Sequence, residues 1–158
     1  MQKISIGKLR ALQQCTSSRG TFTCLAIDHR QNLRKANPSF QSDIELSSFK
    51  QDITNALAIH ATAVLLDPEV SAAQAIASGV LPGDKGLIVA VESTGYKGNA
   101  FARQTHILPG WDVEKAKRMG ASMILRELHV HLKEKNVKLC LIRFAPLISR
   151  GWLASLDD

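Results

Sequence analysis

Short apolar segments that alternate with helix-patterned segments are the feature that most limits how this chain can fold. The apolar or β-favouring segments are residues 21–27, 62–66 and 86–91, with a fourth candidate at 121–128. They are apolar at successive positions, so both faces of each predicted strand are buried. Helices are predicted between them, at residues 4–17, 42–61, 71–79 and 112–120. This order predicts parallel β/α units whose sheet is covered by helices.

The longest predicted helix, residues 42–61, begins with Ser and Asp, which are good helix-capping residues. Its apolar residues Ile44, Phe49, Ile53 and Leu57 recur at near-helical spacing. They predict an amphipathic helix that packs through this face.

Three of the predicted strands are followed by carboxylates, namely Asp28, Asp67 and Glu92. The carboxyl ends of parallel strands converge on one crevice or barrel mouth, where ligands bind. A carboxylate after a strand can also be the N-cap of the next helix or part of an Asx-turn. Three in succession favour a site assembled from several strand ends.

Two folds fit this pattern, a doubly wound open sheet and a β/α barrel. The glycine-rich dinucleotide fingerprint does not follow the first strand, and the P-loop sequence does not occur in the chain. The motifs that would support a nucleotide-binding open sheet are therefore missing. The barrel is the favoured fold.

Composition narrows the class of protein. A chain of 158 residues that is 45% hydrophobic can form one domain with a core. The basic residues behind the net charge of +6 are scattered along the sequence with few aromatic residues among them. This argues against nucleic-acid binding and leaves small anions as the expected ligands.

No signal peptide or apolar run of about 18 residues is seen, so we expect a cytoplasmic protein without a membrane partner. Cys15, Cys24 and Cys140 are widely spaced, and we expect reduced thiols.

Four segments together resemble a known enzyme family. They are LAIDHRQNLRK, AVLLDPE, VAVESTGY and LPGWDVEKAKRMGAS, in this order within residues 21–122. Their order and approximate spacing are similar to those of the tagatose 1,6-bisphosphate aldolase family, which includes sulfofructose-phosphate aldolases. The resemblance implies a (β/α)₈ TIM barrel and class I, Schiff-base cleavage of a phosphorylated ketose to dihydroxyacetone phosphate and an aldehyde. It implies no metal or organic cofactor.

The same resemblance assigns roles to individual residues. Asp28 and Glu92 are expected to support catalysis, Asp28 by orienting or polarising the substrate and Glu92 as a second carboxylate. The expected substrate-binding residues are His29, Arg30, Asp67 and Tyr96. Alternatively, Arg30 forms a salt bridge to Asp67 or Glu92 within the barrel mouth, and Tyr96 serves packing.

The resemblance fails soon after Gly120. The family pattern leads us to expect a lysine-bearing fourth strand, but this chain reads MILRELHVHLKEK there. The Schiff-base lysine of the family lies on a later strand that we do not find. Because a whole barrel needs about 250 residues, we expect the first four to five β/α units with an N-terminal helix. Residues 1–122 are the predicted half barrel and residues 123–158 a divergent tail, from a truncation, a split gene or a changed reading frame.

The tail contains one alternative site. If residues 126–135 form a strand, Glu127, His129 and His131 share a face and could bind a metal ion. If the segment is a helix, the three cannot share a face, and we favour this second interpretation.

Three functions follow. The first is an aldolase fragment that binds a phosphorylated sugar and is inactive alone. The second is a metal-dependent lyase or hydrolase that uses the tail residues. The third is a non-catalytic half barrel completed by another chain or by a second copy. Metal analysis separates the second from the others, and molecular size separates the third.

Overall fold

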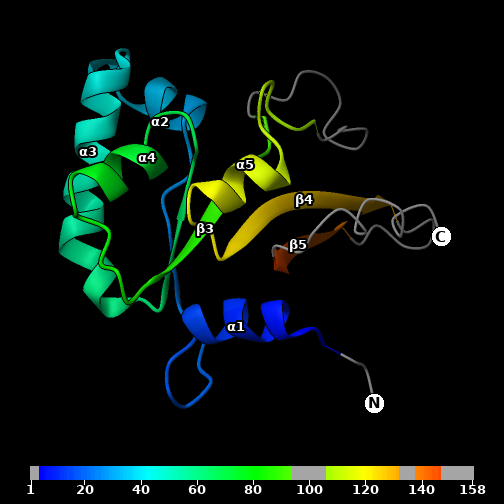
Figure 1. Ribbon diagram of the computed structural model, residues 1–158. Helices are drawn as coiled ribbons and strands as arrows, with labels where there is room; N and C mark the ends of the chain where they lie inside the picture. The colour runs from blue at the N-terminus through cyan, green and yellow to red at the C-terminus, as the bar shows by residue number, and fades with distance from the viewer. Residues whose placement is uncertain (1–3, 94–105, 132–137, 147–158) are drawn as a thin grey trace.

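The computed structural model describes residues 4–93, 106–131 and 138–146, and gives only the backbone for 126–131 and 138–146. The helices are α1 (Ile6–Gln14), α2 (Gln31–Ala36), α3 (Asp43–Leu57), α4 (Ala72–Ala77) and α5 (Val113–Arg118). The strands are β1 (Cys24–Ala26), β2 (Ala63–Leu66), β3 (Gly86–Ala90), β4 (Met123–His131) and β5 (Lys138–Pro146), and 3₁₀ turns span Pro38–Phe40 and Ala58–His60. Figure 1 shows their arrangement.

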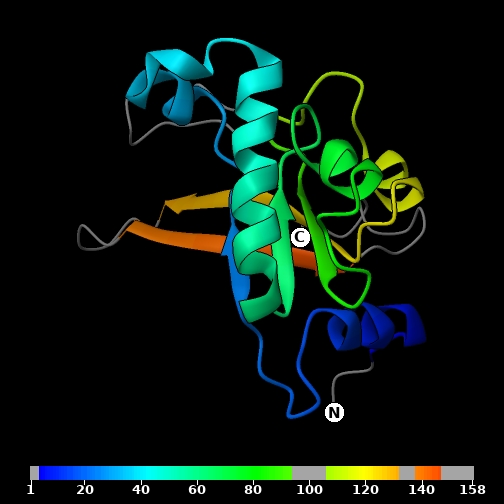
Figure 2. The same ribbon diagram turned by 90° about the vertical axis from the view of Figure 1, so that its left-hand side faces the viewer.

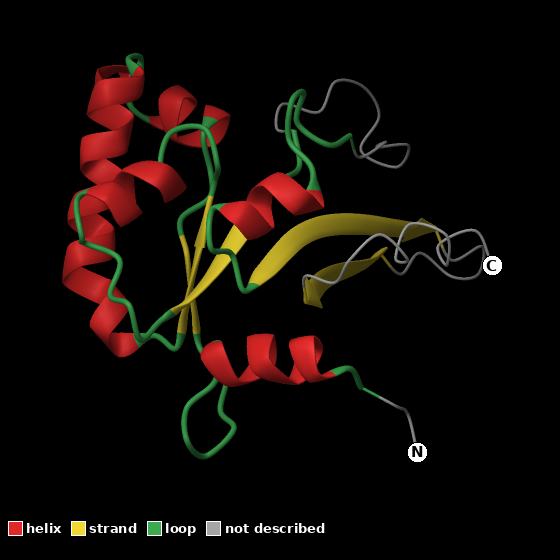
Figure 3. Cartoon of the chain, in the orientation of Figure 1, coloured by secondary structure: helices red, strands yellow, loops and turns green. Residues whose placement is uncertain are grey.

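The strands form one sheet in the order β1-β2-β3-β4-β5. β1, β2, β3 and β4 pair in parallel, with Cys24 opposite Ala63, Ala63 opposite Gly86, and Ile88 opposite Met123. Helices occupy the connections between these strands, as the alternating pattern predicts (Figure 3). The chain therefore has an α/β fold whose first four strands follow the order of a β/α barrel.

The fifth strand departs from that order. β5 runs antiparallel to β4, with Met123 opposite Pro146 and His131 opposite Lys138. Only residues 132–137 separate the two strands, and a parallel crossover needs about a dozen residues or more. The favoured helical interpretation of the segment from residue 126 is thus wrong for residues 126–131, which extend β4. The division of the chain at residue 122 stays a prediction.

Capping residues set the helix ends. The side chain of Ser42 accepts a hydrogen bond from the backbone N–H of Glu45 at 3.2 Å, and its hydroxyl donates to the Glu45 carboxylate at 2.9 Å. This reciprocal pair starts α3 at the predicted residue. Gly79 and Gly120 follow α4 and α5 with φ of 75° and 96°, a conformation that other residues adopt only at a cost. Both glycines were predicted to end these helices.

The predicted packing face of α3 is only partly confirmed, because Ile53 packs against the core but Ile44 and Leu57 do not. Ile44 is 82% exposed and Leu57 is 44% exposed, while Phe49 and Ile53 are only half-buried. The helix instead buries Leu46, Ser47, Lys50 and Thr54. These residues lie at spacings of three and four, so they form one stripe, and a lysine lies at its centre.

Apolar side chains cover both faces of the sheet. One layer joins the sheet to the helices and contains Val64, Leu66, Val89, Ala72 and Ala116 among its members. The smaller layer on the other face contains Ala63, Leu65, Ile88, Ala90, Met123 and Cys15. Figure 2 shows α3 lying along the outer face of the sheet. The two layers explain why the strands are apolar at successive positions.

Helix α1 closes the amino-terminal end of the sheet (Figure 1). The hydroxyl of Thr62 donates to the carbonyl of Cys15 at 2.7 Å, which ties the end of α1 to the start of β2. Burial raises the pKa of the Cys15 thiol to about 11, and the pKa of Cys24 rises to about 11 for the same reason. Both thiols are free, so neither is a ready nucleophile near neutral pH. Within the described residues, no helix is long and apolar enough to cross a membrane.

Candidate active site

The carboxyl ends of β1, β2 and β3 bring together the charged residues that the sequence singled out. Asp67 follows β2 directly, while Asp28 and Glu92 each follow their strands by two residues. Because the three strands are parallel neighbours, these residues lie together at the carboxyl-terminal end of the sheet. Arg30 from the turn after β1 reaches across this end and donates from Nη2 to the backbone carbonyl of Glu92 at 2.9 Å.

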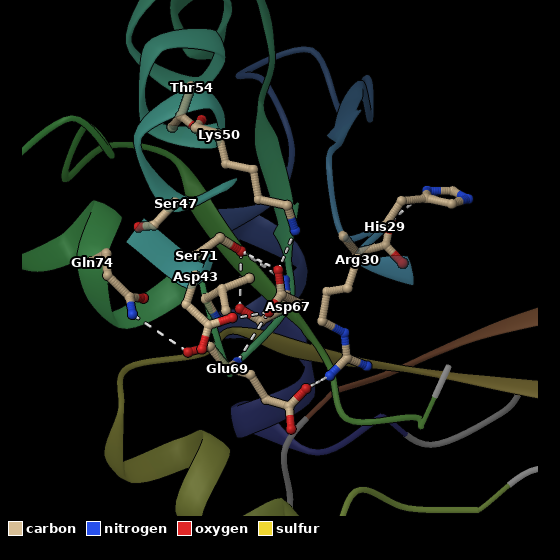
Figure 4. Close-up of polar contacts among 12 residues, drawn as sticks. His29, Arg30, Asp43, Ser47, Lys50, Thr54, Asp67, Glu69, Ser71 and Gln74 are labelled. Atoms are coloured by element: carbon tan, nitrogen blue, oxygen red, sulfur yellow. Dashed lines mark hydrogen bonds and ion pairs between the residues drawn. The ribbon is translucent and has the colours of Figure 1, made fainter. Parts of the chain in front are cut away.

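Arg30 is the central cation of this cluster and is only 4% exposed. Its Nη1 pairs with the carboxylate of Glu69, in the turn after β2 (Figure 4). Its Nε is buried and has no hydrogen-bond partner in the described structure. Burial lowers the pKa of Arg30, and the nearby carboxylates of Asp67 and Asp28 oppose that change. The sequence suggested Asp67 or Glu92 as the salt-bridge partner of Arg30. In the structure Arg30 forms its salt bridge with Glu69, and Glu92 accepts a hydrogen bond through its backbone carbonyl.

Asp67 is fully buried, and both of its carboxylate oxygens are occupied. Oδ2 pairs with the ammonium of Lys50 and accepts a hydrogen bond from the hydroxyl of Ser71 at 2.6 Å. Oδ1 accepts the backbone N–H groups of Glu69 and Val70 at 3.0 and 2.8 Å. These bonds form an Asx-turn, which fixes the path of residues 67–71.

Lys50 reaches this carboxylate from α3, and its side chain is 0% exposed. Burial lowers the pKa of Lys50, and the charge of Asp67 opposes this change. Figure 4 shows the lysine side chain extended from the helix toward Asp67. Lys50, Glu69 and Ser71 were not predicted from the sequence as site residues. The burial of Lys50 could have been inferred from its spacing of four residues from both Leu46 and Thr54, which places all three on one stripe of the helix.

The other predicted site residues lie at the margin of the cluster or outside the described residues. The side chain of His29 is 61% exposed and points away from Arg30 and Asp67 (Figure 4). Its Nδ1 lies 3.8 Å from Oδ1 of Asp28, which is 22% exposed. Glu92 is buried. Tyr96 lies outside the described residues.

The predicted metal ligands of the tail lie on β4. Glu127, His129 and His131 occupy alternate positions of this strand, opposite Ile142, Cys140 and Lys138 of β5. Their side chains lie outside the described part of the structure. Among the described residues, no group of three His, Cys, Asp or Glu side chains could hold a metal ion.

A parallel β/α sheet with a charged cluster at the carboxyl ends of its strands is an arrangement found in β/α-barrel enzymes and in open α/β sheets. A family model described as DeoC/LacD family aldolase matches residues 22–141. The chain belongs to this family, and its parallel strands correspond to part of a TIM barrel. The match contains all the elements that build the cluster, from β1 to the end of β3.

Curated relatives agree with this assignment. Tagatose 1,6-diphosphate aldolase 2 of Enterococcus faecalis is 31% identical over 137 residues, which cover 85% of this chain and 40% of that protein. Tagatose 1,6-diphosphate aldolase 1 of the same organism is 32% identical over 123 residues, covering 77% and 37%. Tagatose 1,6-diphosphate aldolase of Staphylococcus epidermidis is 29% identical over 121 residues, covering 74% and 36%. The chain thus matches less than half the length of these relatives.

Proposed function

We propose that the cluster at the strand ends is part of the substrate site of a class I aldolase. The substrate would be a phosphorylated ketose such as tagatose 1,6-bisphosphate, cleaved by the whole site to dihydroxyacetone phosphate and an aldehyde. One observation carries the proposal: Arg30 is buried at the meeting point of three strand ends and keeps an unused Nε donor. A buried donor of this kind gains free energy when a ligand oxygen binds to it.

We assign the roles as follows. Arg30 donates from Nε to an oxygen of the substrate, and Asp28 and Glu92 polarise the substrate or move protons during cleavage. His29 contacts the substrate from the margin of the site, and we assign Tyr96 to substrate binding as well. Asp67 contributes indirectly, because its two oxygens are already occupied by Lys50, Ser71 and the turn that carries Glu69.

A Schiff base needs a neutral amine that the substrate can reach. Lys50 has the lowered pKa, but its amine is held in an ion pair with the Asp67 carboxylate and is not free to attack a ketone. Lys85 pairs with Asp84, and Lys115 and Lys117 lie on the exposed side of α5. We therefore keep the proposal that these 158 residues alone bind the phosphorylated ligand without cleaving ketose bisphosphates.

Replacing Arg30 with methionine tests the proposed function. We expect the affinity of the chain for dihydroxyacetone phosphate to fall by about 10- to 100-fold, because a charge-assisted hydrogen bond contributes roughly 1.5–3 kcal/mol. Isothermal titration calorimetry measures this affinity. The matched control is Arg118→Met, since Arg118 is exposed on α5 before β4 and pairs with Glu114. Equal affinities of Arg30→Met and wild type, with both proteins folded, would contradict the proposal.

One observation favours a second candidate, a metal-dependent lyase or hydrolase. β4 is a strand, and this is the condition under which Glu127, His129 and His131 share a face. Class I chemistry needs no metal, so we expect elemental analysis to find no stoichiometric divalent metal in the purified chain. One zinc ion per chain that disappears in His129→Ala would instead support the second candidate.

The proposed partner is a complementary barrel half or a second copy of the chain. Among the described strands, β1 pairs only with β2, so its outer edge is open to another strand. We expect light scattering to show a dimer, a larger assembly or binding of the complementary half. A monomer with a sharp cooperative melting transition would contradict this expectation.

A further inference from the structure

A continuous series of polar contacts joins α3 to the ends of three strands (Figure 4). Lys50 pairs with Asp67, and Asp67 accepts the backbone N–H of Glu69. The Glu69 carboxylate pairs with Arg30, and Arg30 donates to the carbonyl of Glu92. Lys50 is therefore connected to the proposed substrate-binding arginine through two carboxylates that lie two residues apart.

The burial of Lys50 is not explained by fold stability alone. Removing an ammonium and a carboxylate from water costs several kcal/mol per ion, and an apolar side chain often fills the same space at no loss of stability. Leu46 and Thr54 on either side of Lys50 show that this face of α3 accepts ordinary side chains. The lysine is better explained by its effect on Asp67.

Asp67 has two cations within reach. Lys50 pairs with it directly, and Arg30 interacts with it electrostatically from the turn after β1. An unpaired buried carboxylate is costly, so Asp67 without Lys50 would attract the Arg30 guanidinium. Arg30 would then leave Glu69, and its Nε would change position.

We propose that Lys50 is a positioning residue for Arg30. By pairing with Asp67, it fixes the turn at residues 67–71, brings Glu69 against Arg30 and leaves the Arg30 Nε for the substrate. The contact with substrate rests on the proposed function above. The positioning itself concerns only the described side chains and can be tested without any ligand.

The ligand-free test observes the Nε–H group of Arg30 by ¹⁵N NMR. The signal is assigned by its loss in Arg30→Lys. In the wild type we expect slow exchange of this proton with water, because Nε is buried. In Lys50→Met we expect a clearly shifted signal, because the guanidinium moves from Glu69 toward the Asp67 carboxylate. The double variant Lys50→Met/Asp67→Asn should restore the wild-type signal, because the asparagine amide keeps an acceptor for the turn and no longer attracts Arg30.

A second variant and a ligand-binding measurement complete the test. If Lys50→Met does not fold, Glu69→Gln removes the carboxylate that pairs with Arg30. Glu69 is half-exposed, so the chain should still fold, and we expect the Arg30 Nε–H signal to shift. An unchanged Arg30 signal in folded Lys50→Met, or in Glu69→Gln, overturns the proposal. The proposal is also overturned if the Arg30 signal of the folded double variant Lys50→Met/Asp67→Asn still differs from that of the wild type. In the ligand arm, the affinity for dihydroxyacetone phosphate should fall in Lys50→Met and recover in the double variant. A wild type that binds no dihydroxyacetone phosphate would contradict the proposed function, while the NMR arm would still decide the role of Lys50.

Discussion

Replacing Lys50 with methionine is expected to lower the free energy of unfolding by about 3–5 kcal/mol, because it leaves the Asp67 carboxylate buried without its cation. The two side chains are both 0% exposed, so water cannot replace the lost partner. A loss of this size is a large part of the roughly 5–15 kcal/mol that stabilises a typical domain. Urea denaturation followed by circular dichroism measures it.

Two further variants serve as the control and the rescue for this measurement. Lys117→Met removes an exposed lysine from α5 and should change the free energy of unfolding by less than about 0.5 kcal/mol. Lys50→Met/Asp67→Asn removes both charges and should recover most of the loss, because an uncharged pair no longer has to be compensated. If Lys50→Met is as stable as Lys117→Met, the ion pair does not hold the turn after β2.

The second large effect is expected at Gly86, the first residue of β3. A Cβ atom there would lie 2.4 Å from Sγ of Cys15, 2.9 Å from its Cα and 2.9 Å from the carbonyl oxygen of Gln14. Two of these atoms belong to the backbone of α1 and its C-cap, so the helix itself must move. We expect Gly86→Ala to lower the free energy of unfolding by about 1–3 kcal/mol or more, as other overpacked cores do.

Amide hydrogen exchange locates the region that the substitution destabilises. Relative to the wild type, Gly86→Ala should speed amide exchange more in α1 than in β2 and β3, because the clash separates α1 from the sheet. Gly83→Ala is the matched control, since no atom lies within 4 Å of the added Cβ and φ is not positive. Equal stability of the two variants would show that α1 does not close this end of the sheet.

The sequence predicted the elements whose determinants are local. Ser42 and Asp43 mark the start of α3, and Gly79 and Gly120 mark the ends of α4 and α5, because capping geometry depends on a few neighbouring residues. The strand order followed from short apolar segments separated by helices. The meeting of Asp28, Asp67 and Glu92 at one end of the sheet then followed from parallel pairing.

The contacts inside the site could not be predicted in the same way. Lysines are almost never fully buried unless they are paired, and the partner of Lys50 lies 17 residues away, directly after β2. Glu69 was read only as part of a motif, because nothing in its neighbours shows that Arg30 lies beside it. Ile44 is exposed because the buried stripe of α3 runs through Leu46, Lys50 and Thr54 instead.

The tail gave the least reliable predictions. Residues 126–131 fit a charged helix as well as a strand, because alternate apolar residues are few there. In the structure this segment is a strand, because it pairs with β5. The short helix α2 was not predicted, since a helix of 6 residues has too few positions to show a helical period.

The most direct test of the central claim is a titration of the ¹⁵N-labelled chain with dihydroxyacetone phosphate, followed by backbone amide chemical shifts. We predict that the shifts change at residues 28–30, at 67–71 and at Glu92, and that Arg30→Met abolishes these changes. The amides of α1, at the opposite end of the sheet, should not respond. Changes confined to α1 or to β4 and β5, or no saturable change at millimolar ligand, would contradict a substrate site at the carboxyl ends of β1, β2 and β3.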